Sequence, residues 1–395
     1  MSLNLDKTAW KRVRLGDVIR RSRTQADPVN GDVDRYVGGG HIDSDSLTIE
    51  RFGDVNDGQM GSTFTYLFEP GQILFVSARP YLRKSGVVNF SGVVADKTYV
   101  LDAIPENGLL QDFLPFVLAS AHFIAYATAE ATGSMNPRLL WGQMQRYEFD
   151  LPPLDEQQRL ADLLWALESH RQALASMAES LEGAVTAKRE SELASASWEL
   201  TLGDALLAIT AGKSLSGKST PAAATTCGVL RVSAVSERGF MALENKELVE
   251  QSAFMPEYAL RNGDLLITRA NTAAYVGRPA IVDADYPNLM LSDKTLRLDV
   301  DEAVASTSFV YECLLSQRIR QRVADTATGT GAAMKNISQK EMRAFPLPKM
   351  AKEAQKKLVV QIGWIRSAAK ASRQEGEAAL TLRGQLLATI FGGAE

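Results

Sequence analysis

Hydrophobic positions along this chain form two alternating patterns. Short apolar runs bounded by Gly, Asn, Asp or Pro occupy residues 1–150 and return in residues 198–348. Such runs predict β-strands within a mixed α and β body. The predicted strands are residues 36–37, 73–76, 93–94, 229–232, 265–267 and 280–282.

Each of these regions ends in a proline-marked stop, and a long helical pattern follows it. Pro152 and Pro153 disfavour a helix, whereas Asp155 and Glu156 place negative charge where a helix dipole is positive. We therefore predict helices over residues 155–197 and about 351–391.

Both predicted helices repeat apolar or small residues every seven positions, which is typical of a coiled-coil seam. In the first helix the seam consists of Leu160, Leu167, Leu174 and Leu181, with Leu163, Met177 and Ala184 at the intervening step. In the second helix it consists of Leu358, Ile365, Ser372, Ala379 and Leu386, with Ile362, Ala369, Gly376, Arg383 and Ile390. We predict that the helices pack antiparallel and approach closely at the small residues; the alternative is two unrelated surface helices.

The chain is a tandem repeat, because five landmarks recur in the same order with offsets of 187, 192, 197, 196 and 196 residues. These landmarks begin at Leu15 and Leu202, Gly71 and Gly263, Asp96 and Asp293, Ala131 and Ala327, and Phe149 and Phe345. A twofold repeated chain carries two similar surfaces, as a dimer does. We predict an α+β fold with two mixed α/β domains at 1–154 and 198–350, separated by helices at 155–197 and 351–395.

One stretch, residues 113–129, is apolar enough to raise the question of a membrane span. It is shorter than the roughly 20 residues that a span needs, and its counterpart in the second repeat is charged. We therefore expect a core helix and no membrane partner.

Composition indicates a soluble globular protein of two or three domains, with 45% hydrophobic and 23% charged residues. Two cysteines at unmatched repeat positions and three scattered histidines predict neither a disulfide framework nor a metal site. The first residues show no signal pattern, so we expect a cytoplasmic protein.

The net charge and the distribution of charged residues point to different kinds of partner. The net charge of −4 is a general argument against nucleic-acid binding. Basic residues nevertheless cluster, and the simplest interpretation of such clusters is a solvated face. They are Lys11, Arg12, Arg14, Arg20, Arg21 and Arg23, followed by Arg79, Arg83 and Lys84 around Tyr81.

One catalytic-looking motif is formally complete, because residues 212–219 read Gly-Lys-Ser-Leu-Ser-Gly-Lys-Ser. A phosphate-binding loop needs a helix directly after the lysine, but Thr220 and Pro221 follow here, and the first repeat has no equivalent. An ATPase would have to depend on Lys218. Neither a methyltransferase tetrad nor an arranged nucleophile, base and acid is found. We predict no catalytic residue.

What remains is recognition, since in both repeats an apolar strand ends in a polar loop that carries arginine. Arginine can read guanine, asparagine can read adenine, and aromatic rings can stack on bases. Two such loops with different side chains would read two different sequences; the alternative is an ordinary surface hairpin. The predicted DNA-binding residues are Arg79, Tyr81, Arg83 and Lys84, then Arg269, Asn271, Tyr275 and Arg278, with His41 and Arg231 as weaker candidates.

Together these motifs resemble those of the specificity subunits of type I restriction-modification systems, over essentially the whole chain. The resemblance rests on the Leu-Gly-Asp and Ala-Thr-Gly motifs, on residues 263–269 and 292–295, and on the helix entry at 151–158. It also rests on Leu386, Leu387 and Phe391 near the end. It implies two target recognition domains that each read one half of a split double-stranded DNA site.

The same resemblance implies partners that dock on the two helices. These would be two copies of the modification (methyltransferase) subunit, together with restriction subunits. S-adenosylmethionine, ATP and Mg²⁺ would then be bound by those partners, with no cofactor on this chain. The positions that match the docking motif are Glu156, Gln157, Gln158, Glu353 and Gln355; the second entry departs from Glu-Gln-Gln, which weakens docking there.

We therefore interpret the chain as a non-catalytic DNA-specificity subunit. A different class stays open: a protein-binding adaptor whose two repeats grip two copies of one partner without DNA. The arginine-bearing loops favour DNA, and the acidic net charge favours the adaptor. Salt-dependent binding of random duplex DNA would distinguish them.

Overall fold

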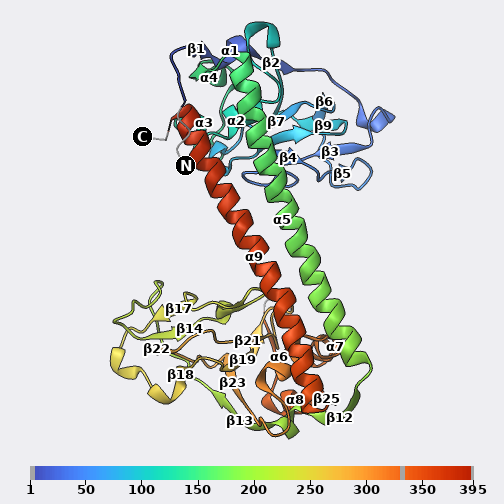
Figure 1. Cartoon of the computed structure of the whole chain (residues 1–395), viewed down its shortest axis with the longest axis vertical. Helices are drawn as coiled ribbons and strands as arrows, with labels where there is room; N and C mark the ends of the chain where they lie inside the picture. Colours follow the sequence, from blue (N-terminus) through green and yellow to red (C-terminus); the bar gives the residue numbers. More distant parts are fainter. Residues whose placement is uncertain (1–4, 330–333, 393–395) are drawn as a thin grey trace. The chain divides into compact units, whose positions relative to one another are not determined.

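The computed structural model describes residues 5–329 and 334–392, and the chain forms two compact units. The first unit consists of residues 1–176 and 372–395, and the second of residues 177–371. The two long helices are α5 (Leu154–Ala194) and α9 (Lys352–Phe391) (Figure 1). Each helix has one part in the first unit and the other part in the second. The first of them ends three residues before its predicted end, because Ser197 begins a strand.

The first unit contains two sheets with the strand orders β2-β10-β7-β8-β4 and β5-β3-β9-β6, and a separate pair β1-β11. In the second sheet β3 and β9 run parallel. The strands are β1 (Lys11–Arg14), β2 (Ile19–Ser22), β3 (Arg35–Val37), β4 (Thr48–Ile49), β5 (Gly53–Asp54), β6 (Phe64–Phe68), β7 (Ile73–Val76), β8 (Ser85–Val88), β9 (Gly92–Ala95), β10 (Thr98–Ala103) and β11 (Glu148–Leu151).

The second unit repeats this plan with the orders β13-β23-β19-β21 and β17-β14-β22-β18 and the pair β12-β25, as the sequence repeat predicts. Two short pairs, β15-β16 and β20-β24, are added. The strands are β12 (Ser197–Thr201), β13 (Leu206–Ala211), β14 (Gly228–Leu230), β15 (Val235–Ser236), β16 (Gly239–Phe240), β17 (Asn245–Glu247), β18 (Ala259–Leu260), β19 (Leu265–Thr268), β20 (Ala270–Asn271), β21 (Pro279–Ile281), β22 (Tyr286–Met290), β23 (Thr295–Val300), β24 (Lys335–Asn336) and β25 (Pro346–Lys349).

The predicted strands coincide with β3, β7, β9, β14, β19 and β21, with one correction. The strand predicted over 229–232 ends at Leu230. There the amide of Ala234 donates to the carbonyl of Arg231, which turns the chain away from the sheet.

The apolar stretch predicted as one core helix is two helices, α2 (Leu114–Ala119) and α3 (Ala121–Glu130). The hydroxyl of Ser120 accepts from the amide of Phe123 at 3.1 Å and thereby caps the second helix. The second repeat has the same break, at Ser316 between α6 (Thr307–Leu315) and α7 (Gln317–Thr326). A capping serine separates the two helices in each repeat. The prediction of a single helix was therefore wrong, whereas the prediction that residues 113–129 lie in the core was right for most of them. Within the described residues, the search for a helix long and apolar enough to span a membrane finds none.

Short helices complete the two units: α1 (Leu15–Val18) and α4 (Trp141–Gln145) in the first, α8 (Gln339–Arg343) in the second. In the second unit α6 lies beside its part of α9, where the guanidinium of Arg366 donates to the carboxylate of Glu312 at 2.8 Å (Figure 1). Each unit has its own main hydrophobic core, to which both long helices contribute.

Within each unit α5 and α9 run antiparallel. In the first unit Leu160 and Leu164 share a core with Leu386 and Ile390. A Cβ atom added to Gly376 would lie 3.8 Å from the Cβ of Leu174, so the small residue permits the close approach that its position predicts. In the second unit Val185 and Leu193 share a core with Leu358 and Ile362.

The seam predicted for α5 needs a correction. Leu163 and Met177 are 45% and 54% exposed and Ala184 is exposed, whereas the residues one position later are buried. Those buried residues are Leu164, Ala178 and Val185. Leucine spacing alone misplaces the seam because the buried stripe also includes polar side chains, namely Gln157, Glu168 and Arg189. Most of the seam predicted for α9 is buried, with Ile365 and Gly376 partly exposed.

Candidate nucleic-acid interface

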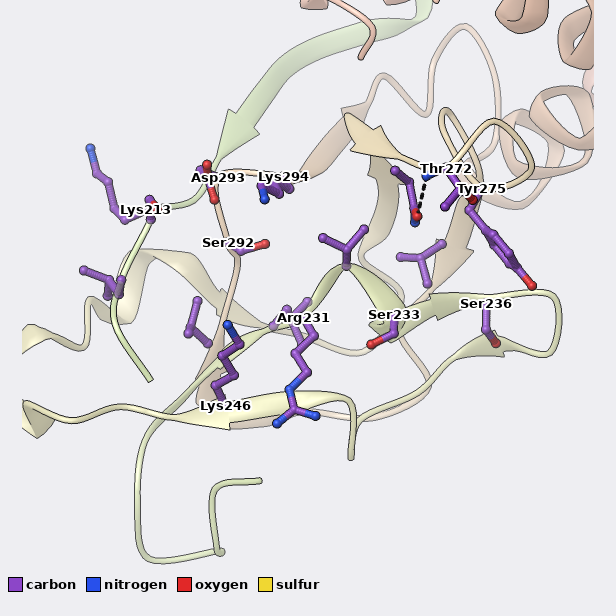
Figure 2. A pocket seen from close by; sticks show the side chains of 17 residues that line it. Lys213, Arg231, Ser233, Ser236, Lys246, Thr272, Tyr275, Ser292, Asp293 and Lys294 are labelled. Carbon is purple, nitrogen blue, oxygen red and sulfur yellow. Dashed lines mark hydrogen bonds between the residues drawn. The ribbon is translucent and has the colours of Figure 1, made fainter. Parts of the chain in front are cut away.

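A cleft of about 710 Å³ opens in the second unit and is lined by apolar side chains and by several polar and charged ones. Its cationic groups belong to Lys213, Arg231, Lys246 and Lys294, and the one carboxylate among its lining residues belongs to Asp293. Figure 2 shows Arg231 and Lys246 beside each other on one side of the cleft. Such an excess of positive charge suits a polyanion.

Strand pairing and backbone hydrogen bonds position these cations. Lys246 on β17 lies opposite Val229 on β14, and Arg231 follows directly after β14. The guanidinium of Arg231 donates to the carbonyl of Ser219. Lys213 is held by a bridge to Ser292, so it reaches the cleft from an extended segment. Four separate segments thus bring cationic groups to one place.

The predicted recognition loop after β19 forms another wall. Asn271 and Tyr275 line the cleft, together with Thr272. The Oδ1 atom of Asn271 accepts from the amide of Thr272 at 2.8 Å, as Figure 2 shows. This bond fixes the carboxamide and leaves its NH₂ group, together with the second lone pair of Oδ1, for a ligand.

Two other predicted residues of this loop do not line the cleft. Arg269 is exposed beside it, and its amide donates to the carbonyl of Lys294 at 2.8 Å. Arg278 is only partly exposed; its guanidinium lies 5.7 Å from the ring of Tyr275 and 3.5 Å from a carboxylate oxygen of Glu237. The structure therefore brings Arg231, Asn271 and Tyr275 together and places the other two at the margin.

The segment 212–219 lacks the geometry of a phosphate-binding loop. Its backbone is extended and bridged, with the amide of Lys213 donating to Leu291 and that of Lys218 to Glu247. The ammonium of Lys218 lies 2.6 Å from a carboxylate oxygen of Glu247. Since these amides are used and no helix follows, residues 212–219 offer no cradle for phosphates.

In the first unit the corresponding loop follows β7. Arg79 is exposed, and its Nε atom donates to Asn136 at 2.7 Å. Tyr81 is 49% exposed. The ammonium of Lys84 donates to the carbonyl of Gly39, and Nδ1 of His41 accepts from the amide of Gly38. Lys84 therefore lies against the glycine-rich turn that carries His41.

Arg83 has an internal role that the sequence does not reveal. Its Nε atom donates to Asp45 at 2.5 Å, and one Nη atom donates to the carbonyl of Ala119 at 2.8 Å. These bonds use two of its five N–H donors and hold the guanidinium against Asp45 and Ala119, so of the four predicted loop residues it is the least free to read a base.

Sequence reasoning missed three lysines of the cleft, Lys213, Lys246 and Lys294. Two of them lay in motifs that the sequence does display. Lys213 belongs to the glycine-rich motif at 212–219, and Lys294 belongs to a repeated landmark. Only the folded structure shows that these two motifs lie at the same cleft.

Two of the predicted docking residues are buried. Gln157 is 0% and Gln355 is 2% exposed. Each amide oxygen accepts from a backbone N–H, of Leu110 at 2.9 Å and of Ser306 at 3.0 Å. Each NH₂ group donates to two carbonyls, so both glutamines anchor the start of their helix to the unit.

The remaining docking candidates lie at the surface. Gln158 and Glu353 are exposed, and Glu156 is partly exposed with an ion pair to Arg159 at 2.6 Å. A partner could therefore contact these three residues. Among the described residues, no group of three or more His, Cys, Asp or Glu side chains could hold a metal ion.

Part of the chain is similar to known proteins. Residues 7–178 match the model of the type I restriction modification DNA specificity domain. A 120-residue stretch is 30% identical to the specificity subunit of the type I restriction enzyme EcoEI from Escherichia coli. Residues 7–178 thus resemble the DNA specificity domain of type I restriction-modification systems. The stretch covers 30% of this chain and 20% of the EcoEI subunit, so the match spans a fifth of that relative's length.

The chain is similar in fold to solved structures. One is the S subunit of a type I system from M. genitalium, with a TM-score of 0.59, 14% identity, and coverage of 100% and 99% of the two chains. Another comes from a study of complex assembly and conformational transition in a type I system, with a TM-score of 0.57, 19% identity, and coverage of 98% and 99%. At these identities the likeness concerns the fold.

Proposed function

We propose that this chain is the DNA-reading component of a type I restriction-modification enzyme and has no catalytic site of its own. Each unit would bind one half of a split site in double-stranded DNA. The observation that carries the proposal is the cationic cleft of the second unit, where Arg231, Asn271 and Tyr275 meet three lysines. Lysines suit phosphates, and asparagine and arginine suit base edges.

A split site is supported by the difference between the two recognition loops. Both loops follow equivalent strands, β7 and β19, in sheets whose shared strands have the same order; the first sheet has β4 in addition. The first loop presents Arg79 and Tyr81, whereas the second presents Arg269 and Asn271. Equivalent placement with different side chains is what two half-sites of different sequence require.

The proposal assigns the helices α5 and α9 to docking and spacing. They would form an antiparallel coiled-coil-like spacer on which two methyltransferase subunits, and through them restriction subunits, assemble. Exposed apolar side chains support this role, since such side chains at helical spacing suit a partner helix. In the second unit they are Met177, Val360 and Trp364, the last 72% exposed. S-adenosylmethionine, ATP and Mg²⁺ would act on those partners.

The test is binding of random-sequence duplex DNA by the full chain, with and without co-purified methyltransferase subunits, over a range of salt concentrations. Neutralised phosphates release counterions, so the logarithm of the binding constant should fall with the logarithm of salt concentration by about 0.9 per phosphate contact. Lys246→Ala should reduce this slope by about one. Lys218→Ala is the matched control, because Lys218 is paired with Glu247 outside the cleft.

A protein-binding adaptor is the competing function. It would show no salt-dependent binding of duplex DNA, and Lys246→Ala would then change nothing. That result would refute the DNA-reading proposal even if two partner copies still bound. Loss of nucleotide binding on Lys218→Ala would instead favour an ATPase, against the paired and extended geometry of that segment.

A further inference from the structure

We propose that contacts from the helix α9 position the recognition loop of the first unit, with Arg383 and Asp45 as the positioning residues. The inference rests on the proposed function, because it concerns how Arg79 and Tyr81 would be presented to DNA. It predicts that the first unit's sequence preference depends on a side chain that cannot touch DNA.

The first observation is the backbone of the loop. Among the described residues, the non-glycine residues with positive φ are Asp45, Arg79 and Arg83, with φ of 60°, 52° and 55°. The left-handed region is unfavourable for residues with a Cβ atom. It persists only where surrounding contacts fix it, and such positions gather at functional sites. Arg79 and Arg83 bracket the short 3₁₀ turn Pro80–Leu82, which carries the exposed ring of Tyr81.

The second observation is that two of these residues hold each other. The Nε atom of Arg83 donates to the carboxylate of Asp45 at 2.5 Å, and the amide of Asp45 donates to the carbonyl of Arg83 at 3.0 Å. The guanidinium of Arg83 also donates to the carbonyl of Ala119. The left-handed turn at Arg83 is therefore fixed from its side chain and from its backbone.

The third observation links this turn to the long helices. Arg383 on α9 is 3% exposed, and one Nη atom donates to the carbonyl of Asp45 at 2.6 Å. Its other Nη atom donates to Glu168 on α5 at 2.5 Å, and Arg171 lies 2.6 Å from the same carboxylate. A continuous chain of hydrogen bonds thus runs from α5 through Arg383 and Asp45 to Arg83.

The second unit makes the same turn without this chain. Phe75 pairs with Ser85 in the first unit, and Ile267 pairs with Pro279 in the second, so the register places Gly277 at the position of Arg83. Gly277 has φ of 65°, which glycine adopts freely. A Cβ atom there would lie 2.9 Å from the side chain of Val323, so only glycine fits. The tether to the helices is thus a device of the first unit.

The experiment measures the sequences that the full chain selects from a library of random double-stranded oligonucleotides, in the presence of its methyltransferase subunits. Arg383→Lys keeps a charge beside Glu168 but cannot also hold the carbonyl of Asp45. Asp45→Asn keeps a side chain that tolerates the left-handed region but weakens the hold on Arg83. Arg366→Lys is the matched control, since Arg366 bonds Glu312 in the second unit. Asn271→Ala identifies which half-site belongs to the second unit.

Both variants should lose discrimination by about tenfold at the half-site that Asn271→Ala leaves intact, and should keep the other half-site unchanged. Arg366→Lys should leave the first unit's half-site intact. Wild-type selectivity at that half-site in folded Arg383→Lys and Asp45→Asn variants would overturn the inference, and so would equal losses at both half-sites. If the Arg383→Lys variant does not fold, the selectivity of the Asp45→Asn variant at the first unit's half-site tests the inference alone. A wild-type chain that selects no split sequence would refute the proposed function instead.

Discussion

At the scale of single residues, Asn271 offers the sharpest test of base reading. It lines the cationic cleft, and a bond to the amide of Thr272 fixes its carboxamide. We predict that Asn271→Ala reduces discrimination at one half-site by about 1–3 kcal/mol for a lost bidentate contact and leaves the other half-site unchanged. Competition binding with single-base variants of the selected site would measure this. Equal weakening for all sequences would mean that Asn271 contacts only the backbone of DNA.

Glu168 allows a prediction about pH. Burial acts to raise the pKa of its carboxyl, but the hydrogen bond from Arg171 and the charges of Arg383 and Arg171 outweigh it and leave the pKa below its usual value. A lowered pKa in the folded state adds stability above the unfolded pKa, and this stability is lost as the pH falls through the folded pKa. Below about pH 4.5, the free energy of unfolding should therefore fall more steeply for the wild type than for Glu168→Gln.

At neutral pH, Glu168→Gln should destabilise the first unit by about 3–5 kcal/mol, because it leaves Arg383 buried without its counter-charge. Denaturant unfolding at several pH values measures both effects. Glu192→Gln is the control on the same helix, since Glu192 pairs with Lys188 at the surface and should matter little. Parallel pH profiles for wild type and Glu168→Gln would contradict the assignment.

Several candidate site residues could be proposed from the sequence, but the contacts that define the role of each residue could be predicted only in part. Arg231, Asn271 and Tyr275 do share one cleft. Arg83 could not be separated from Arg79, because only the fold supplies Asp45 and the carbonyl of Ala119 as its partners. The lysines of the cleft were missed because they lie on segments far apart in sequence that strand pairing brings together.

At the scale of elements, the correction to the α5 seam can be tested on two neighbouring leucines. Leu164 is 0% exposed, whereas Leu163 is 45% exposed. We predict that Leu164→Ala lowers the free energy of unfolding by about 2–5 kcal/mol, through lost burial and a residual cavity. Leu163→Ala should stay within about 0.5 kcal/mol of the wild type. Chemical denaturation of both variants provides the comparison, and the reverse order would restore the seam predicted from leucine spacing.

Trp364 on α9 tests the docking role of the helices. Because it is 72% exposed, Trp364→Ala should leave thermal stability nearly unchanged. If a methyltransferase subunit packs there, the variant should retain one copy instead of two, as native mass spectrometry would show. Leu243→Ala is the matched control, an apolar residue 75% exposed and off the helices. Two retained copies in Trp364→Ala would exclude this docking surface.

Some sequence patterns predicted the observed helices and strands correctly, and others did not. Strands β7 and β19 were predictable because each is a short apolar run that is buried, and the α9 seam was predictable because most residues at its seven-residue spacing are buried. The breaks at Ser120 and Ser316 were not, since a serine within an apolar run signals a helix start only once its hydroxyl has an amide to cap. The α5 seam failed because Gln157 and Glu168 are buried through hydrogen bonds, which no hydrophobic pattern records.

At the scale of the whole molecule, the proposed spacer role makes helix length a determinant of the recognised site. Four residues inserted in both helices, after Ser176 and after Ala371, would lengthen each by roughly 6 Å and nearly preserve its facing. The gap between half-sites should then grow by at most about two base pairs, with unchanged half-sequences. Sequencing of the methylated sites would show this. Insertions of two residues rotate the facing sides apart and should destabilise the chain, and an unchanged gap in a folded four-residue variant would rule out the spacer role.

The contrast between Arg83 and Gly277 bears on the history of the duplicated chain. Glycine satisfies the left-handed turn without help, whereas arginine at that position depends on Asp45 and on the support of α9. An arginine at the turn of the first copy therefore requires an acceptor such as Asp45 beside it. The turn of the second copy cannot take a larger residue in the same way, because the side chain of Val323 occupies the space beside Gly277. After duplication the two copies thus had unequal freedom to diverge, and a comprehensive mutational scan should find the first copy's turn more tolerant than the second's.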